Sequence, residues 1–352
     1  MDASNGYLSY NYTNMKRKFI LLCILLLSTF VYTNAQYLRD SWNEGYLYRT
    51  IEQPEDYSGK VVCTIIKKET LPNIKKAIVY VHGYNDYFFQ SALGDSANAH
   101  GYNFYAVDLR KYGRSLLPNQ DAFFCKKMEE YFADIDTTIA IARAEGNEEI
   151  ILMGHSTGGL STSLYVHEKK QREKVDALVL NSPFLDWNLG KAAEGLAIPV
   201  MSFLGGIFPK MKVQGTSQEA SGYAQSLLKK YNGEWYYNDD WKMSFGHKKR
   251  AGWVHAIQRG QRKVHKGLNI DCPILVMSSD NSVEENAEWK EEYKHSDVVL
   301  DVKEIHKYGD QLGGNVTHIY IKGGLHDLIL SEKPARDETY KVIFEWLKAN
   351  GE

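Results

Sequence analysis

The pentapeptide G-H-S-T-G at positions 154–158 constrains the fold of this chain more than any other feature. It follows the apolar run 150–153 and opens onto a helix-like segment at 159–170. A serine between two glycines on a strand-to-helix turn is the pattern of a nucleophile elbow. We expect glycines there because larger side chains would clash and because glycine tolerates the dihedral angles of a sharp turn best. Such a turn lifts the hydroxyl of Ser156 above a sheet edge, where a histidine and a substrate carbonyl can reach it.

Apolar runs that alternate with helix-like segments surround this pentapeptide. Strands are expected at 60–66, 77–81, 102–107, 150–153, 177–180, 273–277 and 318–321, and helices at 128–144, 159–170, 302–312 and 338–348. Strands that read as continuous apolar runs indicate a parallel sheet that helices cover on both faces. The sequence therefore predicts an α/β fold with a mostly parallel sheet.

The alternation stops at Phe184, and roughly 80 residues pass before the strand pattern resumes. This insert, at about 185–268, is apolar at 196–208 and then rich in aromatic residues. From Lys210 to Lys266 it carries twelve Lys and Arg against four Asp and Glu. We interpret it as a lid, because an insert over the carboxyl ends of parallel strands sits where ligands bind. Its apolar start would suit an acyl chain, and its basic excess would suit an anionic headgroup or peripheral membrane contact. A helical cap with solvated lysines explains the same pattern.

The N-terminus has the pattern of a targeting segment. A basic stretch at 15–18 precedes an almost wholly apolar stretch at 19–32, and the small residue Ala35 precedes Gln36. This is typical of a cleaved secretory signal, and the apolar stretch is shorter than the roughly 20 residues that span a bilayer. We expect residues 1–35 to be an extension and signal peptide, and residues 36–352 to form one exported domain, periplasmic or secreted. A retained anchor is the alternative, and translation could start at Met1 or Met15.

Composition excludes several other classes of function. Apolar residues make up 43% and charged residues 24% of the chain, ordinary values for a globular enzyme. A net charge of −2 gives no reason to expect a nucleic acid partner. The mature chain keeps an odd number of cysteines, Cys63, Cys125 and Cys272, for which free thiols are expected. No His-Glu-x-x-His motif or clustered Cys/His spacing occurs, so we predict no metal and no cofactor.

A serine hydroxyl becomes a good nucleophile when a histidine takes its proton and a carboxylate orients that histidine. In this sheet order the acid and the histidine follow the last strands, in the order Ser, Asp, His. His326 lies directly after the last expected strand and completes a Ser156-based triad. Two aspartates could be the acid. We prefer Asp297, on the turn into a helix that Asp301 could cap, over Asp280, which precedes a polar, acidic excursion.

An oxyanion that forms in the reaction also needs hydrogen-bond donors. One expected donor is the backbone N–H of Thr157, the residue after the nucleophile. The other is expected in the loop after the strand 77–81, where the N–H of Tyr84 follows His82-Gly83. We expect His82 to shape this loop.

Several further segments strengthen the match to a known family. They are His82-Gly83-Tyr84, the stretch 108–115 (DLRKYGRS), the pentapeptide 154–158, Asn181-Ser182-Pro183, the stretch 297–301 (DVVLD) and Gly324-Leu325-His326. In these motifs the chain resembles the α/β-hydrolase superfamily, in particular the branch of monoacylglycerol lipases, lysophospholipases and serine aminopeptidase-like hydrolases. The resemblance runs from about residue 76 to 349, implies a lid after the sixth strand of the fold, and favours Asp297 as the acid. The chain departs from it at Lys111, where the family usually has glycine, and in the excursion 281–296, which lengthens the acid loop.

These features lead to three candidate functions. The first is an exported serine esterase or lipase-like hydrolase that acts on a small-molecule or lipid ester through an acyl-enzyme on Ser156. The second uses the same triad to cleave an amide, as an aminopeptidase-like enzyme would, and would require an acidic pocket for a free amine. The third is a non-catalytic binding protein, which such folds usually become by losing a triad member.

Overall fold

The computed structural model describes residues 36–168, 173–190, 193–214, 219–245, 249–286 and 288–350. The predicted signal peptide at 1–35 lies outside these residues. The chain divides into two compact units, Met1–Leu38 and Arg39–Glu352, and every element from β2 onward belongs to the second. Within the part of the chain that the structure describes, no helix has both the length and the apolarity needed to cross a membrane.

Strands and helices alternate along most of the chain. The strands are β1 (Leu38–Arg39), β2 (Tyr46–Asp56), β3 (Gly59–Lys68), β4 (Lys76–Val81), β5 (Asn103–Asp108), β6 (Glu149–His155), β7 (Ala177–Asn181), β8 (Lys212–Gln214), β9 (Lys249–Arg250), β10 (Ile274–Ser279) and β11 (Val316–Ile321). The α-helices are α2 (Ser91–Ala99), α3 (Phe132–Ala144), α4 (Thr157–His167), α5 (Ile198–Ile207), α6 (Gly222–Leu227), α7 (Ala251–His265), α8 (Val302–Gly309) and α9 (Lys333–Asn350). Short helices of other types are η1 (Gly113–Ser115), η2 (Met128–Tyr131), η3 (Ala193–Ala197), η4 (Glu291–Lys294) and η5 (Leu328–Leu330).

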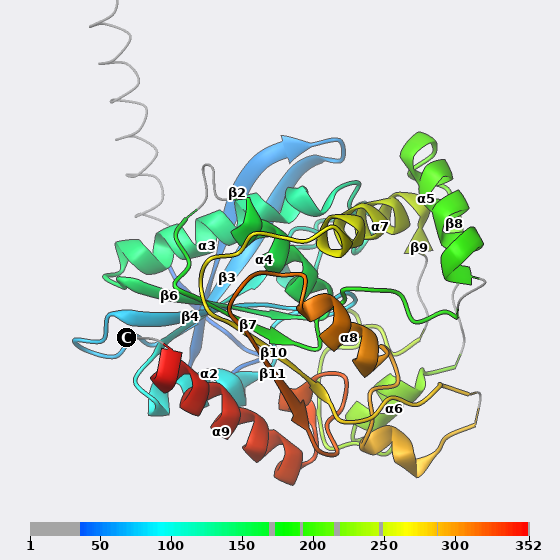
Figure 1. The fold of residues 1–352 in the computed structure, drawn as a ribbon. Coiled ribbons are helices and arrows are strands. Elements are labelled where there is room, and N and C mark those ends of the chain that lie inside the picture. The colour runs from blue at the N-terminus through cyan, green and yellow to red at the C-terminus, as the bar shows by residue number, and fades with distance from the viewer. Residues whose placement is uncertain are drawn as a thin grey trace, which may run out of the picture. The chain divides into compact units, whose positions relative to one another are not determined.

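The long strands of the second unit form one sheet in the order β2-β3-β5-β4-β6-β7-β10-β11 (Figure 1). Strand β3 pairs antiparallel with β2 and β5, whereas the pairs from β5 through to β11 are parallel. The predicted mostly parallel α/β fold is confirmed. Strand β2 was not predicted from the sequence, because it alternates buried with exposed positions and carries charged residues and Pro54.

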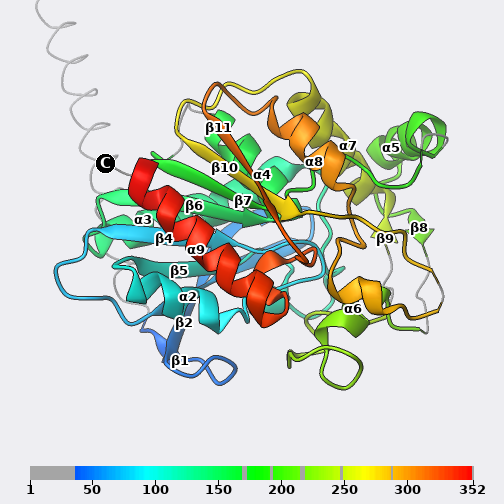
Figure 2. The same ribbon diagram turned by 60° about the horizontal axis from the view of Figure 1, so that its bottom comes forward.

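Helices cover both faces of the sheet, as its apolar strands require. Successive residues of β4 point to opposite faces. Val79 and Val81 join the apolar cluster that includes residues of α3, α4 and α8, whereas Ile78 and Tyr80 join the cluster that includes residues of α2 and α9. Figures 1 and 2 show α3 and α4 on one face of the sheet and α2 and α9 on the other.

The parallel strands β4, β6, β7, β10 and β11 end at the same edge of the sheet. Their registers align Val81 with Gly154 and His155 with Asn181, which in turn pairs with Met277. Loops that follow parallel strands meet at such an edge, where open α/β folds bind their ligands. The polar motifs of the sequence are therefore brought together there.

The insert between β7 and β10 contains η3, α5, β8, α6, β9 and α7. Helix α5 contacts α7 through small and polar residues. The ring of His255 is 2.8 Å from the carbonyl oxygen of Ser202, and a Cβ on Gly205 would lie only 2.0 Å from the carbonyl oxygen of Ala251. The opposite side of α5 and its flanks is apolar and exposed, at Leu196, Val200, Phe203, Ile207 and Phe208. This insert follows β7, which is the sixth long strand if the two-residue β1 is set aside.

Candidate active site

Ser156 lies on the turn between β6 and α4, with φ 53° and ψ −119°. A serine with positive φ is uncommon, and strain of this kind is characteristic of a nucleophile elbow. The flanking glycines are required by space. A Cβ on Gly158 would lie 2.4 Å from the carbonyl oxygens of Val81 and His82, and one on Gly154 would lie 2.5 Å from the hydroxyl of Thr162. The structure corrects our expectation on one point, because the unusual dihedral belongs to the serine and neither glycine has positive φ.

His326 reaches Ser156 from the loop that follows β11. Its Nε2 is 3.0 Å from the hydroxyl oxygen of Ser156, and its Nδ1 is 2.9 Å from Oδ2 of Asp297. All three side chains are buried. A carboxylate at Nδ1 fixes the tautomer in which Nε2 can accept the serine proton. The structure thus brings the three residues predicted as a triad into one chain of hydrogen bonds.

The acid loop explains why Asp297, and not Asp280, contacts this histidine. The chain leaves the end of β10, makes the excursion 281–296, and returns beside its own start. There the N–H of Asp297 donates to the carbonyl of Asn281 at 2.9 Å, and the N–H of Val283 donates to the carbonyl of Asp297 at 3.0 Å. Asp280 is exposed, and its carboxylate accepts the N–H of Gly323 at 2.9 Å.

Backbone donors hold the carboxylate of Asp297 in place. Its Oδ1 accepts the N–H groups of Val299 and Leu300, both at 2.8 Å, which leaves Oδ2 facing His326. Asp301 caps α8 by accepting the N–H of Lys303 at 2.9 Å, as the sequence suggested.

The two expected oxyanion donors are on chain segments that contact or adjoin the nucleophile, because a Cβ on Gly83, the residue before Tyr84, would lie 3.0 Å from Cβ of Ser156. Thr157 is the first residue of α4, where backbone N–H groups lack intrahelical partners. Tyr84 follows His82, whose Nε2 accepts the N–H of Leu109 at 3.1 Å and whose Nδ1 donates to the carbonyl of Gly83 at 2.8 Å. Burial lowers the pKa of His82, which favours the neutral ring that this pairing requires. His82 therefore shapes the loop, as expected.

Lys111 stands where the resemblance expects glycine. Its φ is 68°, in the left-handed region that glycine adopts most easily. The buried ammonium pairs with Asp56 at 2.6 Å and lies 4.3 Å from the centre of the Tyr57 ring. Both partners lie on the β2–β3 hairpin. The replacement of glycine by Lys111 therefore changes contacts with this hairpin and not with the triad.

Three buried charged residues beside the site were not predicted from the sequence: Asp86, Lys242 and Asp327. Asp86 is two residues after Tyr84, and Asp327 is the residue after His326. This adjacency to motif residues was a signal that could have found them. Lys242 had none, because it lies in the middle of the insert.

A cavity of about 1130 Å³ lies beside the site. Tyr84 and Tyr223 line it, and the ring of Tyr223 packs edge-on against His326 with centroids 5.5 Å apart. Its charged lining residues are mostly acidic: Glu219, Asp280, Glu284, Glu285 and Asp301, with Lys249 and Lys303. The insert supplies one wall and the acid loop another.

Comparisons with known proteins identify the family and the fold. Residues 72–333, more than half of the chain, match the family model described as serine aminopeptidase, S33. The fold is similar to a monoglyceride lipase from Saccharomyces cerevisiae, solved as a soluble variant with a substrate analog (TM-score 0.61, 15% identity, 90% of this chain and 95% of that chain).

It is also similar to a monoacylglycerol lipase from Paleococcus ferrophilus (TM-score 0.56, 18% identity, 86% of this chain and 99% of that chain). A thermostable carboxyl esterase from Bacillus coagulans, solved with glycerol, gives a TM-score of 0.57 at 14% identity over 86% of this chain and 98% of that one. A search among curated proteins returned no match. At these identities the solved structures show the fold alone, and they confirm the α/β-hydrolase fold.

Proposed function

The chain belongs to the serine aminopeptidase S33 family, and we propose that it is a serine hydrolase that cleaves carboxylic esters through an acyl-enzyme on Ser156. The observation that carries this proposal is the hydrogen-bond chain from Ser156 through His326 to Asp297, with distances of 3.0 and 2.9 Å. The strained backbone of Ser156 adds support, since such strain clusters at functional sites.

The geometry supports the following sequence of steps. Nε2 of His326 takes the proton from Ser156 as the serine oxygen attacks the ester carbonyl. The N–H groups of Thr157 and Tyr84 stabilise the oxyanion, and Asp297 stabilises the imidazolium. His326 then protonates the leaving alcohol. Water, activated by the same histidine, releases the acid and restores Ser156.

Hydrolysis of p-nitrophenyl esters by the mature chain, with Ser156→Ala as the matched variant, tests this proposal. We expect wild-type turnover and labelling of Ser156 by a fluorophosphonate, and we expect the variant to lose about 10⁴-fold or more in kcat and all labelling. A folded wild-type protein that neither turns over esters nor reacts with the probe would contradict it.

The acidic cavity favours a second candidate, an amide hydrolase for substrates with a free amine. Carboxylates such as Glu285 and Asp280 outnumber the lysines that line the cavity, and a cationic group would be attracted to them. Aminoacyl anilides compared with acyl anilides and esters of equal size separate the candidates. Preference for the free amine by at least tenfold in kcat/KM supports amide hydrolysis.

We further propose that the insert is a lid and that α5 contacts a lipid surface. Large apolar side chains recur on the exposed side of α5 at helical spacing, at Val200, Phe203 and Ile207. The exposed Lys210 and Lys212 follow directly, which suits anionic headgroups. Co-sedimentation with vesicles that contain anionic lipid, compared with neutral vesicles, tests this contact.

We propose that the protein is exported and that cleavage occurs between Ala35 and Gln36. The basic and apolar stretches of the first 35 residues support this proposal. N-terminal sequencing of protein from the periplasm or medium tests it, and a cell-associated protein that begins at Met1 or Met15 would contradict it.

A further inference from the structure

We propose that Lys242 of the insert is a positioning residue, which holds the loop Tyr84–Phe89 in place and so sets the position of the Tyr84 N–H. This inference rests on the proposed function, in which that N–H faces the oxyanion. It assigns to the insert a part in building the active site, in addition to covering it.

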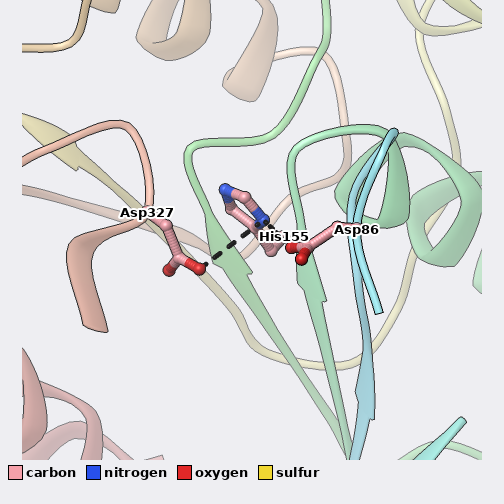
Figure 3. Close-up of side chains that lie close together, drawn as sticks. All are labelled: Asp86, His155 and Asp327. Atoms are coloured by element: carbon pink, nitrogen blue, oxygen red, sulfur yellow. Dashed lines mark ion pairs between the residues drawn. The ribbon is translucent and has the colours of Figure 1, made fainter. Parts of the chain in front are cut away.

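Figure 3 shows a cluster of the buried ionisable side chains Asp86, His155 and Asp327, of which His155 is the residue before the nucleophile. Nδ1 of His155 is 3.8 Å from Oδ2 of Asp86 and 3.8 Å from Oδ2 of Asp327. Each of these residues is next to, or two residues from, a member of the proposed machinery. The cluster therefore joins the loop after β4, the elbow and the histidine loop at one point.

Lys242 completes this cluster from the insert. Its ammonium is 3.0 Å from Oδ1 of Asp86, and its side chain is only 6% exposed. Three aromatic rings surround it, with centroids 5.4 to 5.7 Å from the nitrogen, those of Phe89, Tyr223 and Tyr237. Of these, Phe89 is at the end of the positioned loop and Tyr223 packs against His326.

Charge balance explains why a lysine is needed there. Two carboxylates are buried in the cluster, and an unpaired buried charge is strongly unfavourable. Burial opposes ionisation of Asp86, but Lys242 and His155 outweigh it and lower the pKa of Asp86 to about 2. One ligand atom each from Asp86, His155 and Asp327 lies within 4.8 Å of the others, a spacing that could also suit a metal ion. Lys242 places a positive charge on Asp86 from the chain itself.

Neighbouring hydrogen bonds add to the ion pair. We call the contacts of Asn85, Asp86 and Tyr87 with the insert the clasp. The side chain of Asn85 accepts the N–H of Met243 and donates to its carbonyl, both at 2.8 Å. The hydroxyl of Tyr87 accepts the N–H of Asn238 at 2.8 Å. Three consecutive residues of the loop, Asn85 to Tyr87, are thus bound to the insert.

This clasp lies directly beside the proposed oxyanion donor. Tyr84 precedes the clasped residues, so a shift of Asp86 would be transmitted to the Tyr84 N–H through two peptide units. Displacements of about 1 Å at a reacting centre can lower turnover by roughly 10²-fold.

Three variants test the inference: Lys242→Met, the double variant Lys242→Met/Asp86→Asn, and Lys230→Met as a control for an exposed lysine of the same insert that pairs with Asp239. For Lys242→Met we expect kcat on a p-nitrophenyl ester to fall roughly 100-fold with KM within about threefold. Hydrogen exchange in the peptide that covers Tyr84–Phe89 should rise about tenfold. The control should match the wild type in both measurements.

The double variant separates positioning from folding. It leaves no unpaired buried charge on Asp86, so we expect a melting temperature close to that of the wild type, yet kcat still about tenfold lower and loop exchange still raised. A double variant with wild-type kcat and wild-type loop exchange would overturn the inference, even if Lys242→Met fails to fold. If the wild type proves inactive on esters, the proposed function fails, and loop exchange alone then decides whether Lys242 holds the loop.

Discussion

Between Tyr237 and Ser244 the insert buries a lysine against the catalytic loops, whereas along α5 it exposes phenylalanine and isoleucine. Measured over the whole residue, Lys242 is 5% exposed and Phe203 is 69% exposed, the reverse of what each side chain prefers in water. Both placements are costly by themselves, so each requires a compensating partner. For Lys242 the partner is Asp86 and an aromatic cage.

For α5 the described residues provide no cover, and we propose a lipid surface instead. One insert can thus serve two purposes through two of its segments, the segment around Lys242 and helix α5. The clasp is sensitive to single charges, because it lies in a water-poor site next to the nucleophile. The exposed side of α5 is sensitive to apolar area and should tolerate changes that leave turnover of a soluble substrate unaffected.

The largest expected effect on turnover is in the buried active site that the clasp adjoins. Asp297→Asn should lower kcat on soluble esters by about 10⁴-fold, because the amide disturbs the tautomer of His326. Asp280→Asn should stay within about threefold of wild type, since its carboxylate contacts the backbone of Gly323. Steady-state kinetics with both variants, after melting curves show that each is folded, provides the measurement. Equal losses of kcat in the two variants would show that Asp297 is not the sole triad acid.

An intermediate effect is expected on vesicle binding by the exposed side of α5. The double variant Phe203→Ser/Ile207→Ser should bind anionic vesicles roughly 100-fold more weakly, since two large side chains lose their burial in lipid. Its kcat on a soluble ester should equal that of the wild type. Tyr236→Ser is the matched control, because Tyr236 is 74% exposed but lies elsewhere in the insert. Unchanged vesicle binding in the double variant would show that α5 is not the contact surface.

The smallest effect concerns stability and lies outside the insert, at His306 of α8. Burial, and secondarily His318, lowers the pKa of His306 to about 4. The fold therefore favours the neutral ring, and its contribution is complete above the unfolded pKa near 6.5 and is lost as pH falls toward 4. Discounted for solvent screening, the loss is about 2 kcal/mol between these values.

Denaturant unfolding of the wild type and of His306→Gln at pH 7.5, 6, 5 and 4 measures this loss of stability. We expect the difference in unfolding free energy between the two proteins to shrink as pH falls. If the unfolding free energies of the two proteins change with pH in parallel, His306 is not the group responsible for the loss of stability. Turnover at neutral pH should be similar in both proteins, because the hydrogen bonds of His306 are to Ser278 of β10 and His318 of β11 and not to the triad residues Ser156, Asp297 and His326.

Much of the fold could be predicted because its signals are local in the sequence. The apolar runs at 77–81 and 150–153 correspond to β4 and β6, which lie next to each other in the sheet. Strand β2 escaped prediction, since a half-exposed edge region has no continuous apolar run. The dihedral strain of the elbow was expected at the glycines and lies at Ser156, because the glycines are needed for close approach to neighbouring backbone.

The sequence by itself determined the chain order of the parallel strands, the elbow at Ser156 and the position of His326 after the last strand. Each of these depends on residues that are close in the chain, through hydrophobic period and turn geometry. Only the tertiary structure decided which aspartate meets His326, because that depends on where the excursion 281–296 returns. It also decided that Lys242 meets Asp86 and that the large side chains of α5 stay exposed. Each of these depends on how segments that are far apart in the chain pack together, which no local pattern encodes.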